Sequence, residues 1–416
     1  MTHSFSTAFL LALTLMVGIR LWLSQRQIAH VTTHRSTVPA QFKDRLELAA
    51  HQKAADYTVA QTRFGRLALA SEIVVLLAFT FGGGLQALHD LWSGHVDGLT
   101  YGVALIFSAM AISSLVDLPF ALYRQFVIEQ QFGFNRMTLR LFLTDQLKQT
   151  ALGLVIGTPV LLAVLWLMAK MGSLWWLYVW LFWCGFNLLI LFLYPTWIAP
   201  LFNKFTPLKD EALSTRIESL MTRCGFRAKG FFVMDGSRRS AHANAYFTGL
   251  GASKRVVFFD TLLNRLSHGE VEAVLAHELG HFKHKHVLKR MVMMFALSLL
   301  GFALLGWLSR QLGFFVGLGV SPNLTAPNDA LALMLFMLAL PPFMFFVSPV
   351  FAYFSRRDEY QADAYACQQS NGQDLSMALI KLYKDNSSTL TPDPMYVRFY
   401  YSHPPASERL AAMAAH

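Results

Sequence analysis

The chain has 416 residues, of which 54% are hydrophobic and only 14% are charged. Soluble domains usually carry about 25% charged residues, so this composition, with its positive mean hydropathy, excludes an ordinary soluble protein. The net charge of +10 does not indicate nucleic acid, because basic residues collect in the cytoplasmic loops of membrane proteins and the sequence has no nucleic-acid-binding motif. Its cysteines are scattered and unpaired in spacing, which argues against a disulfide framework.

Seven stretches are apolar over the roughly 20 residues that a membrane-spanning helix needs. The first, Phe5 to Leu23, has no basic region before it and no cleavage site of small residues after it, so we interpret it as a span and not as a signal peptide. The predicted spans are residues 5–23, 67–91, 99–123, 151–168, 174–194, 290–308 and 330–354.

The loops between these spans differ in charge. The loops after the first and third spans are rich in Lys and Arg, whereas the loop after the second has none and those after the fourth and sixth hold only Lys170 and Arg310. This asymmetry predicts an N-terminus outside the cell and a C-terminus in the cytoplasm. The resulting organisation is an N-terminal membrane region with five spans (1–194), a cytoplasmic domain (195–289), two further spans (290–354) and a cytoplasmic helical region (355–416).

The segment 195–289 has the pattern of a small α+β domain. An apolar stripe predicts a helix over 209–224, ended by Gly225. A strand is predicted at 231–234, and strands at 243–247 and 255–259 flank a Gly-Leu-Gly connection and predict a hairpin. Ser267 and Glu270 have the spacing of a capping box, so they predict the start of another helix.

That capped helix carries His277, Glu278 and His281 in an HExxH pattern. Side chains four residues apart lie on one face of a helix, so the two imidazoles can bind one zinc ion. Glu278 then lies beside the ion, in place to take a proton from the water molecule that the ion activates. The alternative is a surface helix that happens to be rich in histidine.

A catalytic zinc site needs a third protein ligand and an open position. Glu359 and Asp363 lie four residues apart on the predicted helical extension of the seventh span. Glu359 fits the third ligand, and Asp363 fits an acceptor that orients a ligand histidine. Spacing alone leaves open whether these acids instead form a solvated face beside Arg356 and Arg357.

Several further motifs occur in a fixed order along the chain, and together with HExxH they resemble the type I CAAX prenyl proteases, a family of gluzincin-type membrane metalloendopeptidases. The resemblance covers nearly the whole chain. The matching segments are 123–129 (YRQFVIE), 132–135 (FGFN), 200–205 (PLFNKF) with 207–208 (PL), 240–246 (SAHANAY), 359–363 (EYQAD) and His403-Pro404 followed by Arg409.

The resemblance implies a fold and a role for each matching residue. It implies a mainly α protein in which seven membrane helices enclose a water-filled chamber with one zinc ion inside. Asn244 and Ala245 would lie on an edge strand to which the substrate adds, and edge strands do offer backbone pairing to an extended peptide. His403 would donate to the developing oxyanion, and Arg409 would hold this region in place. His242 faces either the cleft or solvent. His286 also fits a family position, but we interpret it as structural or solvated.

The expected partners are a peptide or protein substrate, with a prenylated C-terminus as the family's substrate class, and membrane lipid. The chain lacks the longer insertions that we associate with eukaryotic members, which predicts a compact, monomeric bacterial form in the cytoplasmic membrane. A bacterium need not make prenylated CAAX proteins, so a general quality-control metalloprotease is the main alternative. A transporter is a second one, but it would not explain why HExxH, ExxxD and HP motifs lie on one side of the membrane.

Overall fold

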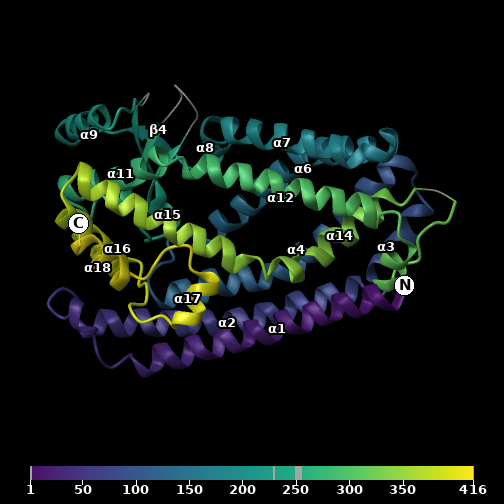
Figure 1. Cartoon of the computed structure of the whole chain (residues 1–416), viewed down its shortest axis with the longest axis horizontal. Helices are drawn as coiled ribbons and strands as arrows, with labels where there is room; N and C mark the ends of the chain where they lie inside the picture. The colour runs from purple at the N-terminus through teal and green to yellow at the C-terminus, as the bar shows by residue number, and fades with distance from the viewer. Residues whose placement is uncertain (1, 228–229, 249–254, 326, 416) are drawn as a thin grey trace.

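The computed structural model describes the whole chain except residues 1, 228–229, 249–254, 326 and 416. Long helices run along the length of the molecule, while a sheet and shorter helices gather at one end (Figure 1). The two termini lie at opposite ends, with the C-terminus beside the sheet (Figure 1). This separation is what an odd number of membrane crossings produces.

The long helices cover the predicted spans. They are α1 (Thr2–Thr33), α2 (Leu48–Phe79), α3 (Gly84–Ser93), α4 (Gly98–Tyr123), α6 (Leu139–Lys170), α7 (Trp175–Leu193), α12 (His286–Leu308), α14 (Asp329–Met344) and α15 (Ser348–Gln369). Five helical segments in the described chain are long and apolar enough to cross a membrane. The number rises to seven if each of two bent helix pairs is one span, which agrees with the prediction.

The two bent pairs are the second and seventh predicted spans. Helices α2 and α3 meet at 48°, and α14 and α15 meet at 63°. The first bend lies at Gly82 to Gly84, where Gly83 has a φ of +74° and a Cβ on Gly84 would come within 2.8 Å of the Ala78 carbonyl. The second follows Pro341 and Pro342 in α14, and proline removes a helix hydrogen bond. The predicted spans at 67–91 and 330–354 therefore correspond to bent helix pairs.

The described part of the chain contains a four-stranded sheet of order β1-β2-β4-β3. Its strands are β1 (Phe205–Pro207), β2 (Phe231–Met234), β3 (Ala245–Thr248) and β4 (Arg255–Phe259), with β2 and β4 parallel and the other pairs antiparallel. The strands predicted at 231–234 and 255–259 are confirmed. The two strands predicted for the hairpin do pair, while their Gly-Leu-Gly connection at 249–251 lies outside the described residues. Strand β3 begins two residues later than predicted, so Asn244 precedes the edge strand instead of lying within it.

Shorter helices complete the chain. They are α5 (Glu129–Gln131), α8 (Ala199–Phe202), α9 (Glu211–Arg223), α10 (Asp260–Leu263), α11 (His268–Lys283), α13 (Leu312–Gly317), α16 (Gly372–Asp385), α17 (Pro394–Tyr400) and α18 (Ala406–Ala414), with single turns at Ala40–Phe42, Arg124–Ile128, Gly172–Leu174, Tyr194–Ile198 and Gly236–Arg238. One hydrophobic core joins side chains of α9, β4, α11, α15, α16 and α18. The segments 195–289 and 355–416 thus fold together, and this shared core brings distant motifs to one place.

Candidate metal centre

Helix α11 carries the HExxH pattern and begins at the predicted cap. The Ser267 amide donates to the Glu270 carboxylate at 2.7 Å, and the Glu270 amide donates to the Ser267 hydroxyl at 3.4 Å. Gly280, inside the motif, packs against α15, where a Cβ would come within 2.9 Å of the Ala362 Cα. This glycine lets the two helices approach closely, and the approach brings the histidines of α11 beside the acids of α15.

The three predicted ligands, His277, His281 and Glu359, converge on one point. The Nε2 atoms of the two histidines lie 3.3 Å apart. Each of them lies 3.4 Å from a different carboxylate oxygen of Glu359. Two ligand atoms about 2.0–2.1 Å from one ion at a tetrahedral angle are about 3.4 Å apart. Each of the three separations is thus close to that value, with one Glu359 oxygen facing each histidine, which is the spacing of side chains that can bind one metal ion.

The electrostatics of the cluster favour a cation at this point. Glu359 is only 3% exposed, and its Oε2 atom is buried without a hydrogen bond to the described part of the chain. Such a buried carboxylate costs free energy unless a charge compensates it. Burial lowers the pKa of His277, but interactions with the Asp363 and Glu359 carboxylates outweigh burial and raise that pKa to about 9. The residues present therefore fit a divalent metal ion.

Asp363 connects His277 to Arg409. His277 Nδ1 lies 2.8 Å from Asp363 Oδ1, so an Nδ1–H there leaves Nε2 to face the cluster. Arg409 donates to both oxygens of Asp363, from Nε at 2.8 Å and from Nη2 at 2.6 Å. All three residues are buried. A ligand histidine held in this way has a fixed tautomer and ring orientation. Asp363 and Arg409 therefore lie where they can play the supporting roles predicted for them from the sequence.

His281 has a different outer partner, which the sequence did not identify. Its Nδ1 atom lies 3.0 Å from Nδ1 of His286, and His286 Nε2 lies 2.9 Å from the Gln361 side-chain oxygen. His286 is 1% exposed, so of the two interpretations, structural or solvated, the structure supports the structural one. Helix α11 ends at Lys283 and Lys285 takes a φ of +57°, and this turn brings His286 back beside the motif. Spacing along a single helix gives no signal for that contact.

Glu278 and His403 flank the cluster. Burial raises the pKa of the Glu278 carboxyl, which suits a group that must accept a proton. His403 Nε2 lies 3.4 Å from Glu359 Oε1, and its Nδ1 lies 2.9 Å from the Ser402 hydroxyl. If the hydroxyl donates to Nδ1, the Nε2–H of a neutral imidazole points at the cluster. The His403 side chain is 60% exposed to the cavity, and partial desolvation by the surrounding chain lowers its pKa, which favours this neutral form.

The predicted substrate-binding residues lie at the start of β3. Asn244 directly precedes this strand and Ala245 is its first residue, and β3 is an edge of the described sheet. The ring of His242 stacks on Phe134 with centroids 4.3 Å apart, and its Nε2 lies 3.6 Å from the Glu129 carboxylate. Side chains from the membrane helices therefore support the segment that precedes β3.

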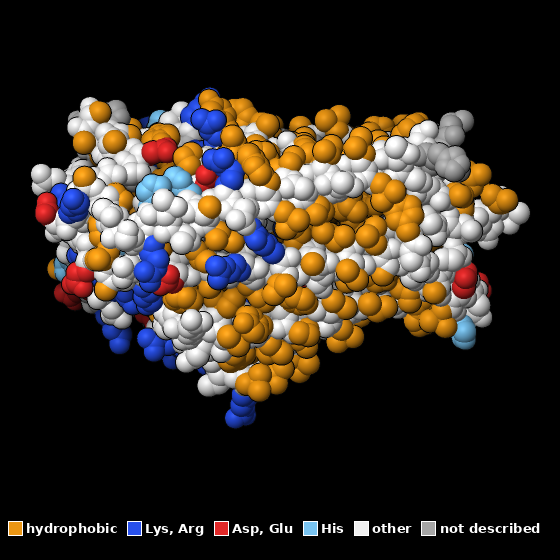
Figure 2. Space-filling model, turned by 90° about the horizontal axis from the view of Figure 1, so that it is seen from below, with side chains coloured by type: hydrophobic (Ala, Val, Ile, Leu, Met, Phe, Trp, Pro, Cys, Tyr) orange, Lys and Arg blue, Asp and Glu red, His pale blue; other side chains and the backbone are white. Residues whose placement is uncertain are grey.

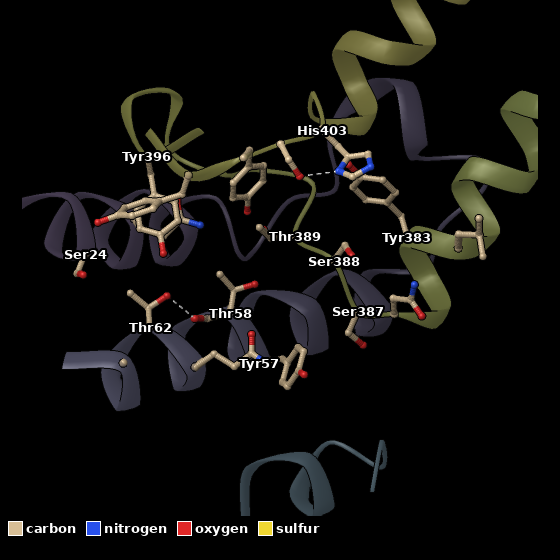
Figure 3. Close-up of a pocket in the computed structure, with 18 of the residues that line it drawn as sticks. Ser24, Tyr57, Thr58, Thr62, Tyr383, Ser387, Ser388, Thr389, Tyr396 and His403 are labelled. Carbon is tan, nitrogen blue, oxygen red and sulfur yellow. Dashed lines mark hydrogen bonds between the residues drawn. The ribbon is translucent and has the colours of Figure 1, made fainter. Parts of the chain in front are cut away.

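A cavity of about 760 Å³ extends from Ala243 and Asn244, just before β3, to His403 and Arg409. Hydroxyl, phenol and amide groups line much of it, and they come from α1, α2, α16 and the segment that leads to His403. Figure 3 shows Tyr57, Thr58 and Thr62 on one wall, with Tyr383, Ser387 and His403 across the space from them. The polar lining suits a peptide backbone better than it suits lipid.

Comparison with known proteins gives the same family that the sequence motifs resemble. The family model for the CAAX prenyl protease N-terminal region, described as five membrane helices, matches residues 27–204, and the model for peptidase family M48 matches residues 207–416. CAAX prenyl protease 1 of Saccharomyces cerevisiae is 41% identical, over 73% of this chain and 70% of that protein. The Homo sapiens homolog is 32% identical, over 94% and 90%.

A solved structure extends the similarity to three dimensions. The crystal structure of S. mikatae Ste24p superposes with a TM-score of 0.92 at 33% identity, covering 98% of this chain and 99% of that one. Sequence and fold therefore agree along the whole length of the chain. The chain belongs to the CAAX prenyl protease members of peptidase family M48, and it is a multi-pass membrane metallopeptidase.

Proposed function

We propose that the metal ion is zinc, that His277, His281 and Glu359 bind it, and that the chain hydrolyses peptide bonds of membrane-associated, prenylated substrates. The observation that supports this most directly is the convergence of the two histidine Nε2 atoms and the Glu359 carboxylate, at separations of 3.3 and 3.4 Å. Two imidazoles and one carboxylate form a ligand set typical of catalytic zinc.

The residues around the cluster have complementary roles in this proposal. Bound zinc would lower the pKa of a water molecule towards neutrality. Glu278 accepts a proton from that water, for which its raised pKa makes it a better base than a solvated carboxylate. The protonated carboxyl group then delivers this proton to the leaving amine. Asp363 and Arg409 hold His277 in orientation. Asn244 and Ala245 present an edge to the substrate backbone, with His242 supporting the segment before it.

His403 supplies a hydrogen bond to the carbonyl oxygen as it becomes an oxyanion. We expect His403→Ala to lower kcat about 10²–10³-fold, as the loss of such a donor does elsewhere, with a smaller change in KM. Steady-state kinetics on one peptide measure both constants. Ser402→Ala is the companion variant, because it keeps the imidazole but removes the partner of Nδ1. A kcat that is unchanged in His403→Ala would contradict this role.

The arrangement of charge supports a cytoplasmic site. Figure 2 shows that Lys and Arg side chains gather over the end of the molecule that holds the sheet, while hydrophobic side chains cover the long helices. Basic residues favour the cytoplasmic side of a membrane. We propose that the sheet and the metal centre face the cytoplasm and that the N-terminus lies outside. Monomeric state and a bacterial cytoplasmic membrane remain predictions.

Substrate class is tested with one peptide in farnesylated and unmodified forms, using the full chain in detergent or liposomes. We expect zinc near one ion per chain and a higher kcat/KM for the farnesylated peptide. Equal turnover of both forms, with efficient cleavage of unfolded proteins, would instead favour a general quality-control protease. Solute flux without proteolysis would favour a transporter.

A further inference from the structure

The segment that leads into β3 is paired with other parts of the chain. Residue Asn135 forms an antiparallel bridge with Ser240. The Ala241 amide donates to the Phe134 carbonyl at 3.1 Å, and the Arg136 amide donates to the residue 239 carbonyl at 3.2 Å. The chain before β3 thus already has backbone partners, and an added strand would have to begin further along.

At Ala243 the partner is a side chain. The Ala243 amide donates to Asn386 Oδ1 at 3.0 Å, and Asn386 Nδ2 donates to the Ala243 carbonyl at 3.4 Å. One carboxamide therefore satisfies both backbone groups of a residue, as a residue on a neighbouring antiparallel strand would. Asn386 follows the last residue of α16, Asp385, which is held to Arg265 at 2.6 Å.

The register of the sheet shows which groups of β3 face its outer edge. The Asn244 carbonyl accepts a hydrogen bond from the Phe259 amide of β4, and Tyr246 lies opposite Val257 of the same strand. Both backbone groups of a residue in an antiparallel ladder point to the same side, and the side alternates along the strand. Ala243, Ala245 and Phe247 therefore direct their backbone groups outward. In the described sheet β3 is the outermost strand on this side.

We propose that Asn386 is a specificity-determining residue that ends the substrate strand between Ala243 and Ala245. The inference rests on the proposed function, in which the substrate adds to β3. The Ala245 amide donates to the Asn244 side-chain oxygen at 2.8 Å, and a substrate strand that pairs at Ala245 and Phe247 replaces that local contact. The Asn386 carboxamide occupies the next outward position. The substrate backbone must leave the sheet there, inside the cavity that Asn386 shares with His403. The length of substrate bound on one side of the scissile bond is therefore limited.

Two nested series of one peptide test this inference. The full chain is loaded with zinc, the scissile bond is mapped by mass spectrometry, and the peptide is lengthened residue by residue at its amino end or at its carboxyl end. In the wild type, kcat/KM should stop rising at a fixed length on one side. In Asn386→Ala it should continue to rise over two more residues on that side, about three- to tenfold, because Ala243 becomes available for pairing.

Two further variants distinguish whether Asn386 ends the substrate strand or only stabilises the fold. Asn386→Asp keeps an acceptor for the Ala243 amide and keeps the position filled, so its length limit should match the wild type. Asp385→Ala removes the ion pair with Arg265 but leaves the carboxamide, so it should lower the melting temperature without moving the limit. Each series is normalised to its shortest peptide.

The results that would overturn the inference are also defined. If Asn386→Ala shows the same length limit as the wild type, or loses activity equally at every length, Asn386 does not set the register and the inference is overturned. A wild-type protein that binds zinc but cleaves none of the peptides would contradict the proposed function itself. Those two failures are distinguishable because the first requires measurable cleavage by the wild type.

Discussion

Replacing Glu278 with Gln is expected to lower kcat by about two to four orders of magnitude, the contribution typical of a general base, while zinc remains bound. Glutamine has nearly the same shape but cannot accept the proton. Because Glu278 lies between the ligand histidines without belonging to the ligand cluster, its loss should not release the metal. Peptide turnover and metal content measured on the same purified sample check both parts of this expectation.

Glu218→Gln is a matched control for this substitution. Glu218 lies exposed on α9, so the same change of charge there should leave both turnover and zinc content near wild-type values. Residual activity of Glu278→Gln within tenfold of the wild type would show that another group acts as the base. Loss of zinc from Glu278→Gln would show that the carboxylate belongs to the ligand set.

Replacing Glu359 with Ala is expected to remove both zinc and activity. The substitution deletes one of three protein ligands and leaves the two histidines without the buried negative charge that compensates a cation. We expect zinc affinity to fall by more than the roughly 10–100-fold that is typical for losing an outer partner of a ligand. Competition with a chelator of known affinity measures the change, and activity should return only at raised zinc concentrations.

Asp363→Asn provides the comparison for that loss. Asparagine keeps the size of the side chain and an acceptor, but it weakens the link from His277 to Arg409. Zinc affinity should fall about 10–100-fold, which is less than in Glu359→Ala. Full zinc occupancy in Glu359→Ala, or a larger loss in Asp363→Asn than in Glu359→Ala, would remove Glu359 from the ligand set.

Features that depend on neighbouring residues could be predicted from the sequence. The capping box of α11, the bounds of β2 and β4 and the location of the apolar helices all depend on patterns within one segment. Two histidines four residues apart share a helix face whatever the rest of the chain does. The sequence therefore predicted the two histidine positions before any tertiary structure was considered. It also predicted where the long helices lie, but not the break in the seventh span.

The remaining features involve segments far apart in the chain. Glu359 reaches the histidines because Gly280 lets α11 and α15 approach, and His277 and Asp363, which meet at the same place, are 86 positions apart in the sequence. No local pattern indicates such a contact, and the same holds for His286 on His281 and for Asn386 on Ala243. Hydrogen bonding and periodicity inside one element are decided by adjacent residues, whereas the meeting of distant elements is decided by how the whole core packs.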